Sequence, residues 1–435
     1  MIDRRDFLQL AVAAAASARP LAAARPQRAG VVGANDRIRV GLIGCGSRGN
    51  QVARDWMKHD DSVFVAACDV FKERLDQTVA RLGETQGRVP DAYEDYRRIL
   101  DRADVDAVFI ATPDHWHSQM TIDACAAGKD VYVEKPVSND IEPALKMVEA
   151  ARRHDRVVQV GQQQRSWHHF QEAAGLFQDG YVGSQVTHCQ MVPPGGGGRF
   201  GARAEQPQDP PAGLNWEMFQ GPAPRKPFVP GRLNWRGWYD YGGGNLSDWG
   251  VHLTDVMNWY MRADATAPLL TSASAQYVRV PRDPERVPDT YAVAWQYERF
   301  VATLANAMIP GTDDPRQLYG NHFFGDKGVL LVNRLGYEVR PYPAGGGRPG
   351  QPPPEPPIAP RRFRDPNGMS EVAESKYGSA THRHVRNFLD AARSRQRPIC
   401  DIEVGFYSVL PCLLALVSVR TGQTVRWDGT SARTA

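Results

Sequence analysis

The fold is decided by the stretch IRVGLIGCGSRGN, residues 38–50, in which a short apolar run leads directly into a glycine-rich turn. Ile38–Ile43 has the composition of a buried parallel strand. Gly44, Gly46 and Gly49 then follow in the pattern G-x-G-x-x-G. In such a turn the first glycine permits the bend, the second lets the backbone approach a pyrophosphate, and the third lets the next helix pack on the strand. The stretch therefore predicts a dinucleotide-binding turn.

The context of this turn matters, because a glycine-rich turn alone is just as often an ordinary loop. A helical stretch at about Asn50–His59 follows it, and Ser62–Cys68 is a second apolar strand that ends at Asp69. Asp69 lies 25 residues after Gly44, close to the separation at which an acid binds the adenosine ribose hydroxyls. A carboxylate there disfavours a ribose phosphate, so NAD is predicted over NADP, although Lys72 could bind such a phosphate.

Two further strands end in polar turns. Val105–Ala111 runs into Thr112-Pro113, and Asp130–Val133 delivers Glu134-Lys135-Pro136. The proline in each turn fixes its own φ angle and restricts the residue before it, so the backbone of the turn is rigid. Because ligands of open α/β sheets bind beyond the carboxyl ends of the strands, we expect both turns beside the cofactor.

A third motif is the segment GGGNLSDWGVHLTD, residues 242–255. Ser247 or Asp248 can cap a helix that runs to about Met261. Spacings of four and three place Asp248, His252 and Asp255 on one helical face. The rest of the helix is largely apolar, so this polar stripe is predicted to face a cavity; a buried structural histidine is the alternative interpretation of His252.

The glycine turn, Asp69, Thr112-Pro113 with His117, and Glu134-Lys135-Pro136 together resemble the glucose-fructose oxidoreductase / inositol dehydrogenase / rhizopine catabolism family, Gfo/Idh/MocA. The resemblance spans roughly residues 37–428. It implies an α/β Rossmann domain at 36–160 and an α+β substrate-binding domain with a large open, mostly antiparallel sheet at 161–375. C-terminal helices at 376–435 are then expected to pack back on the cofactor domain.

The same resemblance implies a set of site residues. In oxidation of a secondary alcohol, His252 is expected to remove the hydroxyl proton, Lys135 to polarise the oxygen, and Asp248 to orient the sugar or the histidine. The residues expected to bind the cofactor come from the turns already described: Gly44, Gly46, Ser47, Arg48, Gly49, Asp69, Thr112, Pro113, His117, Glu134 and Lys135.

Tryptophans in the second half are candidates for a sugar site. Trp216, Trp235 and Trp238 could pack on the C–H faces of a sugar ring, although a structural role is the simpler interpretation of each one. The glycine- and proline-rich segments 193–211 and 341–360 are predicted to be exposed loops. His115-x-His117 has the form of a metal-ligand pair, but no third ligand is in pattern, so no metal site is predicted.

The first thirty residues resemble a twin-arginine export signal. Arg4-Arg5 precedes a short alanine-rich apolar stretch that is too short to span a bilayer, and Ala16-Ser17-Ala18 or Ala22-Ala23-Ala24 offers a cleavage site. We therefore expect an exported, periplasmic protein without a stable membrane span, or a cytoplasmic one if the two arginines are incidental.

The bulk composition is that of a globular protein. The chain has 435 residues, 42% apolar and 23% charged, with a net charge of +3. No basic patch interleaved with aromatic residues occurs, so nucleic acid is not an expected partner. Six cysteines in a chain of this length do not form a disulfide framework and are expected to be mostly small buried residues.

Export bears on the predicted reaction, because an exported enzyme has no soluble NAD pool with which to exchange. The sequence therefore predicts an NAD-dependent oxidoreductase that acts on a secondary alcohol of a sugar or polyol and holds its cofactor tightly. One alternative is a redox-neutral glycoside hydrolase or lyase that oxidises the sugar transiently, and another is a non-catalytic sugar-binding protein on the same fold. We expect the family's homodimer or homotetramer.

Overall fold

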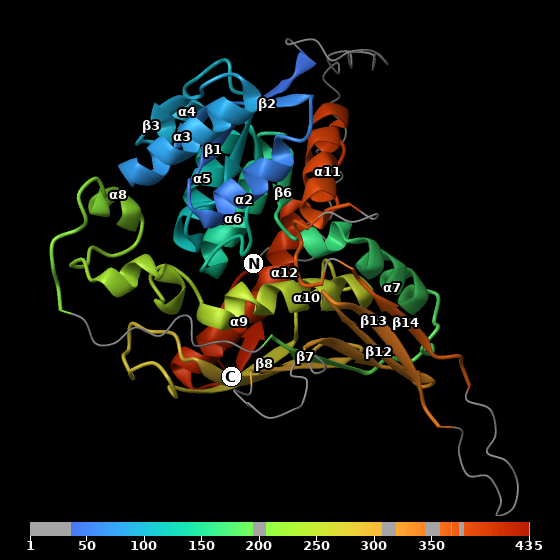
Figure 1. The fold of residues 1–435 in the computed structure, drawn as a ribbon. Coiled ribbons are helices and arrows are strands. Elements are labelled where there is room, and N and C mark those ends of the chain that lie inside the picture. Colours follow the sequence, from blue (N-terminus) through green and yellow to red (C-terminus); the bar gives the residue numbers. More distant parts are fainter. Residues whose placement is uncertain are drawn as a thin grey trace, which may run out of the picture. The chain divides into compact units, whose positions relative to one another are not determined.

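The computed structural model describes residues 36–194, 206–306, 319–343, 357–366, 368–373 and 378–434. Residues 37–435 form one compact unit (Figure 1). The predicted export segment lies outside the described residues, as do most of the two predicted loops.

The first sheet is parallel and has six strands in the order β3-β2-β1-β4-β5-β6. The chain therefore starts in the middle, at β1, and the strand order reverses between β1 and β4. This reversal is the point at which open α/β sheets bind ligands. The strands are β1 Ile38–Ile43, β2 Ser62–Cys68, β3 Asp91–Tyr93, β4 Ala107–Ile110, β5 Asp130–Val133 and β6 Val158–Val160.

Helices connect these strands. They are α2 Ser47–Trp56, α3 Lys72–Gln86, α4 Arg97–Leu100, α5 Asp114–Ala126 and α6 Ile141–Arg153. One of them, α2, begins earlier than the predicted start at about Asn50. Helix α2 starts inside the glycine motif, and α5 starts directly after Pro113, whose extended backbone serves as its N-cap.

The second sheet has ten strands in the order β14-β13-β12-β11-β7-β10-β9-β8-β15-β16. All neighbours are antiparallel except β7 and β10, which confirms the predicted large, mostly antiparallel sheet. The strands are β7 His188–Val192, β8 Leu270–Gln276, β9 Thr290–Gln296, β10 Val301–Ala305, β11 Gly320–Phe324, β12 Gly328–Asn333, β13 Gly336–Pro341, β14 Arg361–Arg364, β15 Val425–Trp427 and β16 Ala432–Thr434.

Helices cover one face of this sheet. They include α7 His168–Gln178, α9 Gly244–Asp248, α10 Gly250–Tyr260 and α12 Ile402–Thr421, of which the last three lie between the two sheets (Figure 1). Along β9, Tyr291, Val293 and Trp295 are buried while the alternate residues are exposed. The other face of the sheet is therefore open to solvent in this region.

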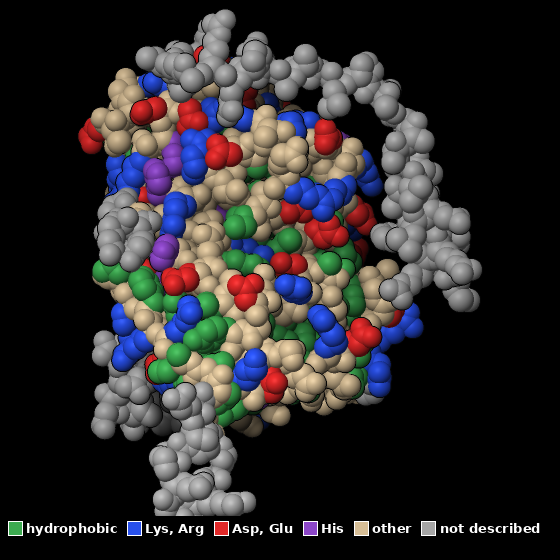
Figure 2. Space-filling model, turned by 90° about the vertical axis from the view of Figure 1, so that its right-hand side faces the viewer, with side chains coloured by type: hydrophobic (Ala, Val, Ile, Leu, Met, Phe, Trp, Pro, Cys, Tyr) green, Lys and Arg blue, Asp and Glu red, His purple; other side chains and the backbone are tan. Residues whose placement is uncertain are grey.

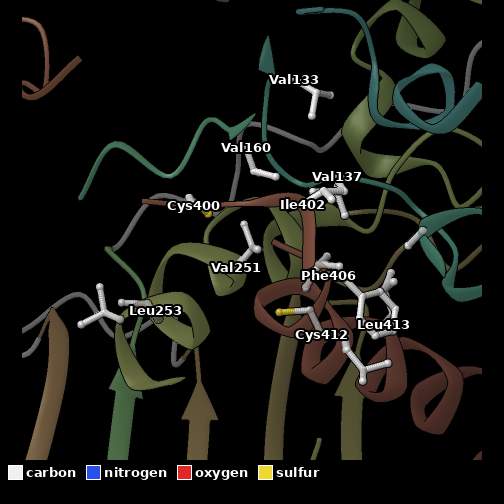
Figure 3. Close-up of a cluster of buried hydrophobic side chains, with 14 of the residues drawn as sticks. Val133, Val137, Val160, Val251, Leu253, Cys400, Ile402, Phe406, Cys412 and Leu413 are labelled. Carbon is white, nitrogen blue, oxygen red and sulfur yellow. The ribbon is translucent and has the colours of Figure 1, made fainter. Parts of the chain in front are cut away.

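The core between the two sheets is continuous. Val133 and Val160 from the first sheet, Val251 from α10, and Ile402 and Phe406 from α12 belong to one buried cluster (Figure 3). Among the described residues, α12 is the one helix long and apolar enough to cross a membrane; 72% of its apolar window is buried within the protein, where it packs as a core helix.

The helix α11, Ala380–Ser394, returns to the first sheet. Phe388 packs edge-on against Trp56 of α2, with 5.5 Å between ring centroids, and Val385 and Leu389 join the same cluster. A C-terminal helix thus packs on the Rossmann region. The domain boundaries at residues 160 and 375 stay predictions, since residues 37–435 form a single unit.

The surface mixes charges of both signs. On the face shown in Figure 2, Lys and Arg side chains are interspersed with Asp and Glu. The cysteines Cys45, Cys68, Cys125, Cys189, Cys400 and Cys412 are all free and buried, as small apolar side chains would be.

Candidate active site

The glycine turn has the geometry that a pyrophosphate site requires. Gly44 has a φ of +99°, and a Cβ there would lie 2.7 Å from the backbone of Ala111. A Cβ on Gly49 would lie 2.1 Å from the carbonyl oxygen of Gly44, so this glycine lets α2 pack against β1. A Cβ on Gly46 would meet no atom within 4 Å. The turn is therefore tight on its protein side and open above Gly46, which fits a dinucleotide.

Asp69 is fixed at the end of β2, next to this turn. Its Oδ2 accepts a hydrogen bond from the backbone N–H of Cys45 at 2.7 Å, and its Oδ1 accepts one from that of Phe71 at 2.8 Å. Burial raises the pKa of this carboxyl despite these two bonds. The arrangement positions the acid where an adenosine ribose is expected.

A cavity of about 780 Å³ connects the glycine turn with the helix pair α9–α10. Its volume lies within the range of small-molecule sites. Nearly all of the predicted site residues line it: Gly44, Gly46, Ser47, Arg48, Asp69, Thr112, Pro113, His117, Glu134, Lys135, Asp248 and His252. Gly49 is not among them, because it packs beneath the turn.

Lys135 and Asp248 form an ion pair in this cavity. Lys135 Nζ donates to the carboxylate Oδ1 and to the backbone carbonyl of Asp248, at 2.8 Å each. Arg236 Nε donates to the same Oδ1 at 3.1 Å. Burial alone would raise the pKa of Asp248, but Lys135 and Arg236 outweigh it and hold the pKa well below its ordinary value. Asp248 is therefore ionised and holds the ammonium group at the end of β5.

This ion pair explains an error in the predicted helix cap. The segment forms two helices, α9 and α10, separated at Trp249, and neither Ser247 nor Asp248 caps α10. The carboxylate of Asp248 is occupied by Lys135 and Arg236 instead of by helix N–H groups.

His252 lies beside a second charged group. Arg334, in the turn between β12 and β13, places Nη2 3.1 Å from His252 Nε2. Arg334 also pairs with Glu371, which in turn pairs with Arg48 of the glycine turn. Burial would raise the pKa of Glu371, but the two arginines lower it to about 2. A continuous chain of charges therefore joins the cofactor turn to His252.

Several charged residues of the cavity were not predicted as site residues, among them Asp114, Arg236, Arg334 and Glu371. Asp114 stands inside the Thr-Pro-Asp-His-Trp-His run, so its position beyond β4 could have identified it. Burial raises its pKa well above the ordinary value. Arg236 lies in a short 3-10 helix, Trp235–Gly237, and Arg334 and Glu371 lie in turns. None of the three belongs to a local motif, and only the tertiary fold brings them here.

The two histidines of the His-x-His pair contact backbone. His115 Nε2 lies 3.0 Å from the carbonyl of Phe219, while the His117 nitrogens lie 2.7 and 2.9 Å from the carbonyls of Pro136 and Thr112. Burial lowers the pKa of both to about 4. His117 thus ties the turn after β4 to the turn after β5. The described residues contain no group of three or more potential metal ligands.

Asp255 does not share the cavity, contrary to the prediction from its spacing. It is fully buried, and its Oδ1 accepts hydrogen bonds from Arg165 Nε at 2.8 Å and from Ser408 Oγ at 2.7 Å. Arg165 also pairs with Asp264 at 2.6 Å. Asp255 therefore belongs to a structural ion-pair cluster under α12.

Of the three candidate tryptophans, one lines the cavity and two do not. Trp235 lines the cavity, where its ring stacks on the guanidinium of Arg236. Trp216 is buried in a satellite cluster, and Trp238 lies between two arginines whose guanidinium carbons are each 4.2 Å from its ring centroid. Only Trp235 is placed to contact a sugar.

Residues 213–221, which contain α8 Trp216–Gln220, form a segment that contributes to the wall of the cavity. At one end, Lys72 N–H donates to the carbonyl of Gly213 at 2.9 Å, just beyond Asp69. At the other, Trp116 Nε1 donates to the carbonyl of Phe219 at 3.0 Å. The side chains of Leu214, Met218 and Phe219 line the cavity. The 213–221 segment therefore bridges the ends of β2 and β4 over the expected cofactor path.

Comparison with known proteins supports this arrangement. The chain is 36% identical over 168 residues to glycosyl hydrolase family 109 protein 2 of Shewanella sp. (strain ANA-3), a match that covers 34% of this chain and 37% of that protein. It is 28% identical over 161 residues to myo-inositol 2-dehydrogenase of Thermotoga maritima, covering 36% of this chain and 47% of that protein. The matches thus span less than half the length of these relatives.

A similar fold occurs in the WlbA dehydrogenase from Bordetella pertussis, solved in complex with NADH and UDP-GlcNAcA. The TM-score is 0.61 at 19% identity, covering 90% of this chain and 99% of that one.

Two family models match the chain. The model for the oxidoreductase family's NAD-binding Rossmann fold matches residues 38–162, and the model for the same family's C-terminal alpha/beta domain matches residues 199–298. Together with the shared fold and the two curated relatives, these matches identify the chain as a member of the Gfo/Idh/MocA oxidoreductase family.

Proposed function

We propose that the protein oxidises a secondary alcohol of a sugar or polyol with an NAD that stays bound between turnovers. The observation that carries this proposal is the Lys135–Asp248 ion pair, which shares one cavity with His252 and with the glycine turn. When bound, the cofactor would accept a hydride from the carbinol carbon. The chain then has to bind the hydroxyl, stabilise its developing negative charge and accept its proton.

Lys135 and His252 are the groups proposed to contact the hydroxyl. Asp248 holds the Lys135 side chain at the end of β5, so its position needs no reorganisation when substrate binds. Trp235, at the same cavity, offers an aromatic face to the apolar side of a sugar ring. The partly buried Lys135–Asp248 pair favours a catalytic over a purely sugar-binding role, because it places a group capable of proton transfer in the same cavity as the glycine turn.

Retention of the cofactor is supported by the 213–221 segment. A dinucleotide with its ribose at Asp69 and its pyrophosphate at Gly46 would share the cavity with Leu214, Met218 and Phe219 of this segment, which would slow its release. The bonds at Lys72 and at Trp116 are among the hydrogen bonds that hold the segment in place. A retained cofactor also suits the twin-arginine signal, which exports folded proteins, and a periplasmic location is part of this proposal.

NAD is proposed over NADP because Asp69 would repel a ribose phosphate at its own position. The assembly is proposed to be a homodimer or homotetramer, for which the solvent-facing side of the large sheet offers a surface.

A second candidate function is supported by the relative named as a glycosyl hydrolase. A retained cofactor can be reduced and reoxidised within one turnover, so the net reaction need not be an oxidation. Oxidation of a ring hydroxyl to a ketone acidifies the neighbouring C–H; loss of that proton expels the aglycone, water adds, and the hydride returns to the ketone. The net change is hydrolysis of the glycosidic bond.

Isotope labelling from deuterium oxide distinguishes the two candidate reactions. Turnover of a glycoside in deuterium oxide should place deuterium on the carbon next to the transiently oxidised one if the cleavage is redox-neutral. Transfer of hydride between two sugars leaves that carbon unlabelled. Accumulation of an oxidised sugar with reduced cofactor, without cleavage, supports the oxidoreductase.

A further inference from the structure

The contact between Arg334 and His252 determines which ring nitrogen of the histidine carries its proton. Arg334 Nη2 lies 3.1 Å from His252 Nε2. A guanidinium has only N–H groups and no acceptor, so Nε2 must accept this hydrogen bond. The lone pair of Nε2 is therefore already in use.

Arg334 is held in this position from two sides. Its Nη2 lies 3.2 Å from Glu371 Oε2, and its guanidinium carbon lies 4.7 Å from the ring centroid of Trp249. Its side chain is only 10% exposed. Glu371 is itself anchored by Arg48. The donor at His252 is thus fixed by the fold, and no surface side chain is involved.

The surroundings keep the His252 ring uncharged. Burial lowers its pKa well below the ordinary value, and the nearby cations Lys135, Arg334 and Arg48 lower it further. The carboxylates in this region are paired with those cations, Asp248 with Lys135 and Glu371 with Arg48 and Arg334. A neutral ring has one N–H, which must then be on Nδ1. Nδ1 is buried and has no hydrogen-bond partner among the described residues, while the ring lines the cavity.

We infer that Arg334 fixes His252 as its Nδ1–H tautomer, so that His252 donates a hydrogen bond to the substrate oxygen and does not remove its proton. The identity of that oxygen rests on the proposed function. His252 would then resemble the neutral imidazoles that act as electrophiles in other enzymes. This differs from the role of base that the sequence resemblance implies.

The proton balance follows from this assignment. The hydride leaves the carbinol carbon for the nicotinamide, and the hydroxyl proton passes to Lys135 Nζ after the ammonium group of the resting ion pair has released one of its protons to water. His252 keeps its proton throughout and stabilises the alkoxide-like oxygen. Arg334 is a positioning residue, because it acts on the reaction only through His252.

Nitrogen-15 NMR of histidine rings tests this inference without a substrate. The full protein, labelled with ring-15N histidine, is measured at pH 7, and the His252 signals are assigned by their absence in His252→Asn. We expect a protonated Nδ1 and an unprotonated Nε2. A protonated Nε2, a doubly protonated ring, or a mixture of tautomers in the unaltered protein would overturn the inference.

Two arginine variants test whether Arg334 sets the tautomer of His252. Arg334→Met should convert the His252 signals into a mixture of tautomers and should raise the pKa of the ring, because one neighbouring cation is lost. Arg236→Met is the matched control: Arg236 lines the same cavity but bonds Asp248, so the tautomer should persist. An unchanged Nδ1–H signal in folded Arg334→Met would show that Arg334 does not set the tautomer.

Kinetics give a second readout once a substrate is found. Asn at position 252 keeps an N–H donor but is not a base, whereas Leu keeps neither property. If His252 is a donor, kcat of His252→Asn should stay within about tenfold of the unaltered protein, and that of His252→Leu should fall about 100-fold or more. An equal fall in kcat in both variants would mean that His252 acts as the base. If no alcohol is oxidised at all, the proposed function fails while the NMR result still tests the tautomer.

Discussion

Lys135 Nζ lies 2.8 Å from the carboxylate of Asp248, although the two residues are 113 positions apart in the chain. One belongs to the turn after β5 of the parallel sheet, and the other ends the helix α9 that leads to the second sheet. The ion pair thus joins the cofactor-binding region to the substrate side of the cavity. It is the contact around which the proposed chemistry is arranged.

Replacement of Lys135 tests this arrangement. Lys135→Met should lower turnover by about 100-fold or more, because both the proton acceptor and a hydrogen bond to the oxygen are lost. The amount of NAD released on denaturation should stay unchanged, since the glycine turn and Asp69 are intact. Lys146→Met is a suitable control, because Lys146 is an exposed lysine paired with Glu142 on α6. Near-normal turnover in Lys135→Met would contradict the assignment.

Asp255 provides a test of the structural assignment. Asp255→Ala should destabilise the protein by about 3–5 kcal/mol, because it leaves part of the buried Arg165 guanidinium without its counter-charge. Under conditions where the variant is folded, its turnover should stay within a few-fold of normal. Urea unfolding and initial rates measure the two effects separately. A stable protein with abolished turnover would place Asp255 in the active site after all.

The 213–221 segment yields a kinetic prediction. Met218→Ala removes apolar surface from the cavity wall and should weaken the binding of NAD by about 1 kcal/mol. Release of bound NAD should then be roughly fivefold faster. Glu217→Ala is the matched control, because Glu217 is the neighbouring residue and its side chain is exposed. Release can be followed by exchange against isotopically labelled NAD. Equal release rates in both variants would mean that the segment does not retain the cofactor.

The pH dependence of stability can be tested at His59, outside the cavity. Burial and the neighbouring His382 lower the pKa of His59 from 6.5 to about 4. Between these values the unfolded chain binds a proton that the folded protein does not, so stability falls as the pH drops through this window. Between pH 7 and pH 5, the loss in unfolding free energy should be about 2 kcal/mol smaller in His59→Gln than in the unaltered protein. Identical pH profiles from urea titrations would contradict the lowered pKa.

Much of the cofactor region could be predicted because its determinants are local. The apolar run before Gly44, the spacing to Asp69 and the prolines after Thr112 and Lys135 each fix a short piece of backbone. Parallel strands bring such turns to one edge, so the cavity could be predicted without knowledge of the packing. The paired Lys135 and Asp248 could be named from the family resemblance, but their contact could not.

The remaining site residues could not be predicted, because they depend on distant packing. The interruption at Trp249 breaks the helical spacing from Asp248, and Asp255, three residues after His252 in α10, binds Arg165 and Ser408 of α12 instead of entering the cavity. Arg334 and Glu371 enter the cavity from a hairpin turn and a loop that carry no motif. Strands β7, β13 and β14 flank the glycine- and proline-rich segments, so the local sequence pattern gives little indication of them.

The proposed function requires that the protein keep its NAD bound, so the nucleotide content of the purified protein tests it. The full chain is prepared without added cofactor, denatured, and its supernatant is assayed enzymatically for NAD(H) and NADP(H). We predict close to one NAD(H) per chain and little NADP(H). A protein that is empty after purification, and that binds and releases NAD freely, would contradict the retained cofactor and would indicate an ordinary exchanging dehydrogenase.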